Sequence, residues 1–297
     1  MTTQRRLRKV KTTMSIHAHR RTLELLDGEY ASIHHGRSHD FDDLREYQPG
    51  DEVKDIDWKA TARSHVPLVK RYIASRQHNV LLVVDSGRNM AAIAESGESK
   101  RELAILVAGV LGYLATRHGD RVALLMGDQE RRQDMQEGGS ESHLERMLRR
   151  IDEAISVEGP RSNLAAVLEH AVRRMRRRSL IVVVADDLAY THDLDVHLGR
   201  LHARHEVLWV SIGDADLMSR AGDHRELVGV DTGAGLPAFL RRDRGLRKAF
   251  DGASAERRER LETGLRTLGI ASARIASTET AIGSLFTLLE RHRRARR

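Results

Sequence analysis

Residues 80–90, VLLVVDSGRNM, join a run of five apolar residues to an aspartate and a polar turn. A short apolar run rich in β-branched side chains is typical of a strand buried on both faces of a sheet. Asp85 follows this run directly, and open α/β sheets bind their ligands beyond the carboxyl ends of their strands. The stretch therefore predicts a buried parallel strand that leads into a candidate binding loop.

The same pattern recurs along the chain and alternates with segments of helical character. Further strands are predicted at 121–127, 179–187, 205–213 and 272–277. Helices are predicted at 101–119, 141–155, 163–177, 192–203, 256–269 and 279–295. We expect a loop at 128–140, where the sequence is polar. Strands that alternate with helices of this length predict βαβ crossovers, and so a mainly parallel α/β sheet with helices on both faces.

The composition restricts the class of protein. The chain has 297 residues, of which 40% are hydrophobic but only 4% aromatic, so aliphatic side chains must fill the core. Cysteine is absent, which excludes disulfides and thiolate metal sites. No window approaches the roughly 18 apolar residues of a membrane span, and the basic N-terminus is not followed by the apolar core of a signal peptide. We therefore expect a cytoplasmic protein without a transmembrane segment.

The net charge of +7 is concentrated at the two ends of the chain. Segments 5–11 (RRLRKVK) and 291–297 (RHRRARR) carry five Arg or Lys residues each. We expect both segments to be solvated tails. Nucleic-acid binding through these Arg-rich tails is an alternative, but no aromatic side chains that could stack on bases are interleaved with the basic residues.

The chain divides by composition into four parts. They are a basic polar lead-in at 1–27, an N-terminal extension at 28–78, the α/β domain at 79–290 and a basic tail at 291–297.

The extension contains a dense charged block at residues 41–63, FDDLREYQPGDEVKDIDWKATAR. Pro49 and Gly50 predict a turn, after which Asp51 is expected to cap a short helix. The block braces this segment against the sheet, gathers carboxylates around catalytic metal ions, or contacts partner proteins. We favour the brace, because the acidic residues alternate with Arg and Lys and have no metal-ligand spacing. Its candidate residues are Arg45, Glu46, Gly50, Asp51, Asp57, Trp58 and Arg63.

Motifs of several enzyme classes are absent from the sequence. There is no HExxH zinc motif, no GxSxG nucleophile elbow, and neither a GxxxxGK[ST] nor a GxGxxG phosphate loop. The sequence therefore does not indicate a zinc protease, an α/β-hydrolase or a nucleotide-binding enzyme of these kinds.

The Asp85 loop and the charged block together resemble a known family. An aspartate loop after a buried strand, with a later hydroxyl and a later aspartate, is similar to the von Willebrand factor A fold. In that fold a metal-ion-dependent adhesion site uses D-x-S-x-S, a later Thr and a later Asp. Within the superfamily, LREYQPGD…IDW…AR, VDSGRNM and the closing LRTLGIASARIAS resemble the bacterial family known as domain of unknown function 58 (DUF58), over residues 28–290.

This resemblance also implies a site, from which the sequence departs. Asp85 matches the first aspartate of the pattern, but Gly87 and Asn89 stand where the two serines are expected. Ser162 falls at the threonine position and Asp186 at the late aspartate. The candidate metal ligands are therefore Asp85, Asn89, Ser162 and Asp186, and the candidate partner contacts are Gly87 and Asp187. We expect a partly degenerate site with at most weakly bound Mg²⁺ or Mn²⁺, because octahedral coordination tolerates the loss of a ligand badly.

The resemblance further implies partnership with a MoxR-type AAA+ ATPase, with the chain acting as an adaptor in the maturation or assembly of an unknown client protein. We therefore expect a non-enzymatic interaction module. A partner carboxylate would complete a weak cation shell at the strand ends, or would accept hydrogen bonds from Asn89 and Ser162 directly. The enzymatic alternative is a metal-dependent phosphoester hydrolase that uses Asp85 and Asp186.

Overall fold

A computed structural model describes most of the chain. The described residues are 5–18, 20–35, 41–49, 51, 53, 56–64, 66–72, 77–187, 190–191, 193–215, 227–230, 235–236 and 244–295. Gly50 of the charged block lies outside them.

The centre of the fold is a six-stranded sheet. Its strands are β3 (Asn79–Asp85), β4 (Arg121–Gly127), β5 (Arg132–Gly138), β6 (Leu180–Asp186), β7 (Glu206–Ile212) and β10 (Ala271–Ile275). They lie in the order β10-β7-β6-β3-β4-β5, and only β5 runs antiparallel to its neighbour. This is the order of a doubly wound sheet, whose switch point lies between β3 and β6. The predicted α/β fold is thereby confirmed.

The predicted loop at 128–140 was wrong in part, because residues 132–138 form the edge strand β5. Exposed and half-buried side chains alternate along it, as expected for an edge strand with one face in water. Its sequence, RQDMQEG, is polar, so the apolar pattern that identified the central strands could not identify this one.

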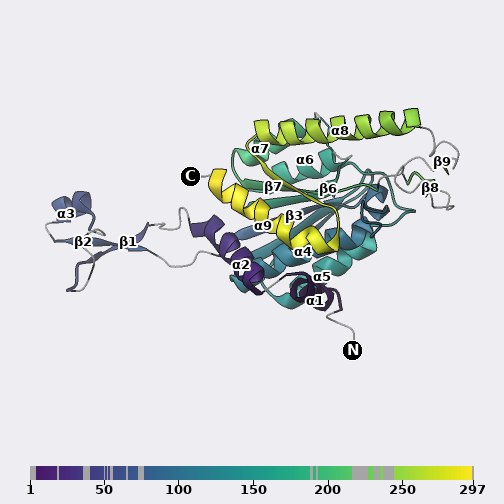
Figure 1. Ribbon diagram of the computed structural model, residues 1–297. Coiled ribbons are helices and arrows are strands. Elements are labelled where there is room, and N and C mark those ends of the chain that lie inside the picture. Colours follow the sequence, from purple (N-terminus) through teal and green to yellow (C-terminus); the bar gives the residue numbers. More distant parts are fainter. Residues whose placement is uncertain are drawn as a thin grey trace.

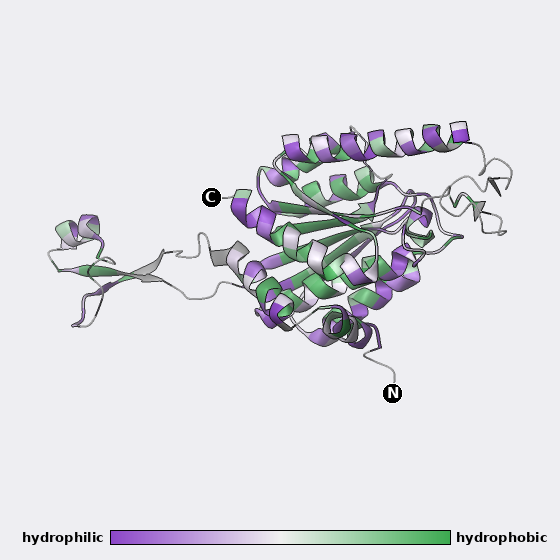
Figure 2. Ribbon diagram, viewed as in Figure 1, coloured by the Kyte–Doolittle hydropathy of each residue, from purple (hydrophilic) through white to green (hydrophobic). Residues whose placement is uncertain are grey.

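Successive side chains of the central strands face two separate cores. Val80, Leu82 and Val84 of β3 pack in the larger core, whereas Leu81 and Val83 pack in the smaller one on the opposite face. This alternation follows from the two-residue period of a strand. Figure 2 shows the apolar strands between helices whose outer faces are hydrophilic.

Helices cover both faces of the sheet (Figure 1). The larger core is closed by α4 (Lys100–Arg117), α5 (Glu141–Ala154) and α9 (Thr278–Ala295), and the smaller core by α6 (Leu164–Arg174), α7 (Asp193–His202) and α8 (Arg244–Thr267). A short pair, β8 (Leu227–Val228) and β9 (Gly235–Leu236), precedes α8. Among the described helices, none has the length and apolarity needed to span a bilayer.

The first residues of the chain were predicted to be a solvated segment, but they are folded onto the body. They form α1 (Arg5–His17) and α2 (Arg20–His35), and α2 runs across the expected boundary at residue 27. Leu7, Val10 and Met14 of α1 are buried in the larger core. Gly109 of α4 lets α1 approach closely, because a Cβ at this position would collide with the Val10 side chain.

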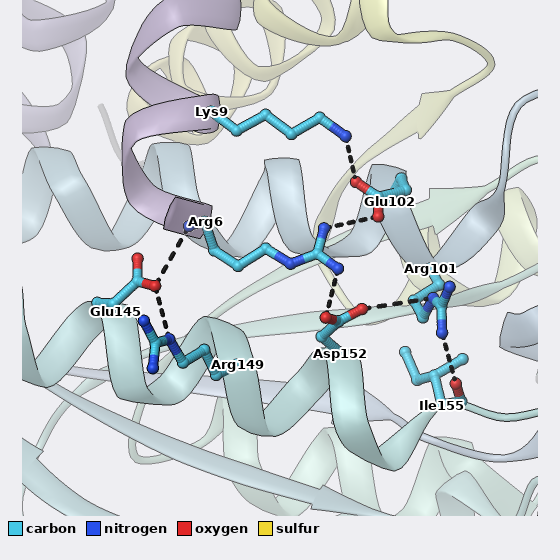
Figure 3. Close-up of polar contacts among 8 residues, drawn as sticks. All are labelled: Arg6, Lys9, Arg101, Glu102, Glu145, Arg149, Asp152 and Ile155. Atoms are coloured by element: carbon cyan, nitrogen blue, oxygen red, sulfur yellow. Dashed lines mark hydrogen bonds and ion pairs between the residues drawn. The ribbon is translucent and has the colours of Figure 1, made fainter. Parts of the chain in front are cut away.

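The basic residues of α1 bind acidic residues of the body (Figure 3). The Arg6 guanidinium donates to Glu102 of α4 at 2.6 Å and also pairs with Asp152 of α5. Lys9 Nζ donates to Glu102 at 2.7 Å. Glu145 of α5 accepts hydrogen bonds from the backbone N–H groups of Arg6 (3.2 Å) and Leu7 (2.7 Å). Arg6, Lys9 and Lys11 of this segment are thus paired with carboxylates of the body.

Residues 291–295 of the C-terminal basic segment complete α9, which agrees with the helix predicted at 279–295 but not with a free tail. Arg293 binds Glu29 of α2 at 2.9 Å, and His292 is buried with its Nε2 3.1 Å from Glu206. Residues 296 and 297 lie outside the described part of the chain.

The charged block does not lie against the sheet, so the predicted brace was wrong. Its strand β1 (Phe41–Glu46) pairs antiparallel with β2 (Leu68–Tyr72), which follows the block, and α3 (Trp58–Ser64) packs on β2. Together β1, α3 and β2 form an arm. Figure 1 shows this arm projecting away from the body. Trp58 and Val53 are 65% and 62% exposed, so neither packs against the sheet.

Polar contacts hold the arm together internally. The Arg45 guanidinium donates to both carboxylate oxygens of Asp51, at 2.5 and 2.8 Å. The cap of α3 is Asp57 and not Asp51, since Asp57 Oδ1 accepts from the N–H groups of residues 59 and 60 at 3.0 Å. Glu46 and Arg63 take part through local backbone contacts: the Glu46 carbonyl accepts from Arg45 at 3.2 Å, and Arg63 Nε donates to the residue 59 carbonyl at 3.3 Å.

Candidate functional site

Three loops meet beyond the carboxyl ends of the central strands. After β3, the Ser86 N–H donates to the Gly127 carbonyl at the end of β4, at 3.0 Å. The Arg88 N–H then donates to the Pro160 carbonyl at 2.8 Å, in the loop before α6. These bonds bring Ser162 against the Asp85 loop, as expected for residues that follow parallel strands and open helices at one edge of the sheet.

Gly87 lies in the tightest part of this junction. Its N–H donates to Asp85 Oδ1 at 2.9 Å, which closes a small turn at the strand end. Its backbone is extended (φ −68°, ψ 164°), a conformation open to any residue. A Cβ at this position, however, would overlap the backbone and the hydroxyl of Ser162. Close packing therefore accounts for a glycine where the adhesion-site pattern has a serine.

Asp85 is completely buried. Burial raises its pKa to about 6, although the Gly87 N–H, the Ser162 hydroxyl and the Lys100 ammonium all act to lower it. Neither Asp85 Oδ2 nor Ser162 Oγ makes a regular hydrogen bond within the described part of the chain. Both oxygens are buried, so a ligand could reach them only if the surrounding loops opened.

Asp186, at the end of β6, is also fully buried. Burial raises its pKa to about 7; the Lys100 ammonium opposes this shift, while the carboxylates of Asp85, Asp214 and Asp187 reinforce it. Mutual repulsion of this kind is expected where several carboxylates share one strand-end site.

Lys100 is the residue that the sequence analysis missed. It is the first residue of α4, and its side chain is only 1% exposed. Its Nζ lies 3.6 Å from Asp186 Oδ2 and pairs more closely with Asp214 Oδ1. A sequence signal existed, because a lysine at the start of an apolar helix is unfavourable for the helix dipole and calls for a compensating contact.

The remaining candidates lie at the rim of the site. Asp187 accepts a hydrogen bond from Arg274 Nε at 2.9 Å, and Arg274 also binds Glu95, so the predicted partner contact is engaged in an ion-pair network. Asn89 is half-buried in the short 3₁₀ helix η2 (Arg88–Ala91), and its backbone carbonyl accepts from the Ala92 N–H at 3.2 Å. A ligand role for its side chain stays a prediction.

Comparison with known proteins identifies the family. The profile of the family described as "Protein of unknown function DUF58" matches residues 43–260. This chain belongs to the DUF58 family. An uncharacterized protein from Mycobacterium tuberculosis is 30% identical over 262 residues, which cover 84% of this chain and 81% of that protein.

Two solved structures that match this chain have low sequence identity to it. An aerotolerance-related membrane protein from Bacteroides fragilis is 14% identical, with a TM-score of 0.42 over 72% of this chain and 98% of that chain. A von Willebrand factor type A protein from Catenulispora acidiphila is 9% identical, with a TM-score of 0.42 over 75% of this chain and 43% of that one. The strand order of this DUF58 chain is that of a doubly wound, mainly parallel α/β sheet.

The strand-end residues of this DUF58 chain do not fit a protein-built site for a divalent cation. Asp85 Oδ2 and Ser162 Oγ are suitable oxygens, but Mg²⁺ requires near-octahedral coordination. Gly87 offers no side chain and no space for one, and Asp186 faces the Lys100 ammonium. Among the described residues, no group of three or more His, Cys, Asp or Glu side chains has a geometry that could hold a metal ion.

Proposed function

We propose that this chain is a non-enzymatic interaction module that serves a MoxR-type AAA+ ATPase as an adaptor in the maturation or assembly of a client protein. The resemblance that placed the chain in the DUF58 family supports the choice of partner. The observation that carries the non-enzymatic part is the burial of Asp85 and Asp186, both 0% exposed. A substrate could reach these carboxylates only if the surrounding loops opened.

Recognition then falls to groups at the surface of the same loops. Asn89 is half-buried there, whereas the Ser162 hydroxyl is buried against the Asp85 loop. A side-chain amide both donates and accepts hydrogen bonds, so Asn89 suits a polar side chain or the backbone of a protein partner. The site would act by docking, and the energy for remodelling the client would come from the ATPase.

The hydrolase alternative finds no support in the groove beside α8. A groove of about 750 Å³ runs along α8, β10 and the end of α9. Its lining includes Asp187 and Arg274 but neither Asp85 nor Asp186. A phosphoester in this groove would therefore not meet the carboxylates that the hydrolase hypothesis requires.

Nucleic-acid binding through the terminal segments also has less support than its charge suggested. Arg6 and Lys9 pair with Glu102, and Arg293 pairs with Glu29. Phosphate groups would have to compete with these internal partners.

The experiment is a binding measurement between the full chain and a MoxR-type ATPase of the same organism, by biolayer interferometry with ATP or ADP present. We expect saturable binding, weakened about tenfold, or roughly 1.4 kcal/mol, by Asn89→Arg. Arg204→Glu is the matched control, because Arg204 is exposed just before β7, at the opposite edge of the sheet.

Two outcomes would contradict the proposal. The first is no binding of the wild-type chain to the ATPase in either nucleotide state. The second is divalent-metal-dependent hydrolysis of bis(p-nitrophenyl) phosphate that is lost in Asp85→Asn, which would favour the hydrolase.

A further inference from the structure

Lys100 combines two features that are each unfavourable for an ammonium group. It lies at the N-terminal end of α4, where the helix dipole repels a positive charge, and its side chain is almost completely buried. Nothing in the packing of an aliphatic core requires a lysine here. The position is tolerable only if nearby carboxylates compensate both effects.

Such carboxylates surround it from three separate segments. Asp186 comes from the end of β6, at 3.6 Å, and Asp214 from the segment after β7, in closer contact. Asp85, at the end of β3, is near enough for the ammonium charge to lower its pKa. The Asp186 and Asp214 contacts bridge residues far apart in the sequence, as the ligands of a strand-end cation do.

The backbone holds Lys100 in this place. Its N–H donates to the Ala92 carbonyl at 3.0 Å, and isolated bridges join Ile93 to Ser99 and Ala94 to Asp214. The loop that follows the Asp85 turn therefore folds back over the strand ends and places Lys100 beside them. This arrangement is specific to the tertiary structure and brings a fixed positive charge to the acidic centre.

We infer that the Lys100 ammonium replaces the divalent cation of a metal-ion-dependent adhesion site, so that the strand-end face of this chain holds its shape without metal. The glycine at position 87 is consistent with this assignment. The Lys100 ammonium does not require octahedral coordination, so it does not need the serine oxygen that the adhesion-site pattern has at this position. The inference deepens the proposed function. It rests on that function only for the claim that a protein partner binds the strand-end face. Its test needs no partner protein, so either can fail alone.

The first measurement is titration of the full wild-type chain with Mg²⁺ and with Mn²⁺ by isothermal calorimetry, alongside thermal unfolding with EDTA or with each metal. We expect no saturable heat at millimolar metal, and the same Tm with metal as with EDTA. Saturable binding of one ion per chain that disappears in Asp85→Asn would overturn the inference. The result of this first measurement does not depend on whether a Lys100 variant folds.

The second measurement compares Lys100→Met with Lys248→Met in EDTA. Methionine keeps most of the length of the side chain and removes the charge, and Lys248 is an exposed lysine of α8 that serves as the matched control. We expect Lys100→Met to lower Tm by several degrees, with partial recovery in Mg²⁺ or when Asp186→Asn is added. Lys248→Met should have the wild-type Tm. A Lys100→Met protein as stable as the control would overturn the inference.

Discussion

The close approach of Gly87 to Ser162 makes a sharp prediction for Gly87→Ala. The added Cβ would overlap backbone and side-chain atoms of Ser162. The extended backbone of Gly87 suits alanine as well as glycine, so the substitution introduces no torsional strain. Steric overlap is therefore the main effect of the substitution on the free energy of the folded state.

The size of the effect depends on whether Ser162 can move away. The two residues before Ser162 are held by different segments, because the Pro160 carbonyl accepts from the Arg88 N–H and the Arg161 carbonyl accepts from the Gln129 N–H, both at 2.8 Å. Overpacking of a well-held site costs about 1–3 kcal/mol. For a domain of this size that free energy lowers Tm by about 2–12 °C.

The assay is urea unfolding followed by circular dichroism, with the midpoint and slope fitted for each variant. Gly283→Ala is the matched control, since Gly283 lies inside α9 and a Cβ added there would meet no atom within 4 Å. Alanine should stabilise that helix by about 0.5–1 kcal/mol. If Gly87→Ala proved as stable as the wild type, Ser162 would not be held against this loop and our account of the missing serine would be refuted.

Three further predictions concern other parts of the molecule. Leu7→Ala should lower the free energy of unfolding by about 2–5 kcal/mol in urea, because Leu7 is buried in the larger core; a loss below half a kcal/mol would mean that α1 does not dock. Asp186 has a folded-state pKa of about 7, above the 3.8 of an unfolded aspartate, so its contribution to stability falls as pH rises from about 4 to about 7. Asp186→Asn should remove this part of the slope in Tm measured against pH, and a variant with an unchanged slope would contradict the assignment. Trp58→Ala should leave Tm within about 1 °C of wild type, since surface changes are usually worth less than half a kcal/mol, and should weaken binding to the ATPase if the exposed arm contributes a second contact; a large loss of Tm would show that the arm packs on the body.

Local sequence predicted an element correctly where all of its side chains had the same environment. The β-branched runs of β3 and β6 are apolar on both faces because both faces are buried, so their position could be predicted without the fold. The same logic failed for β5, whose exposed face removes the apolar signal. It failed for α1 as well, because three buried residues among many basic ones resemble a solvated tail.

The sequence by itself determined the alternation of strands and helices, the place of Asp85 at a strand end, and the family through its charged block. Tertiary structure alone decided the chemistry of the site. Lys100 is fifteen positions from Asp85 in the sequence, Ser162 is farther still, and no local pattern relates them. The parallel sheet brings the strand ends together, and burial there sets which charges can coexist. The physical reason is that a buried charge is tolerated only beside its partners, and those partners come from segments that meet only in the folded chain.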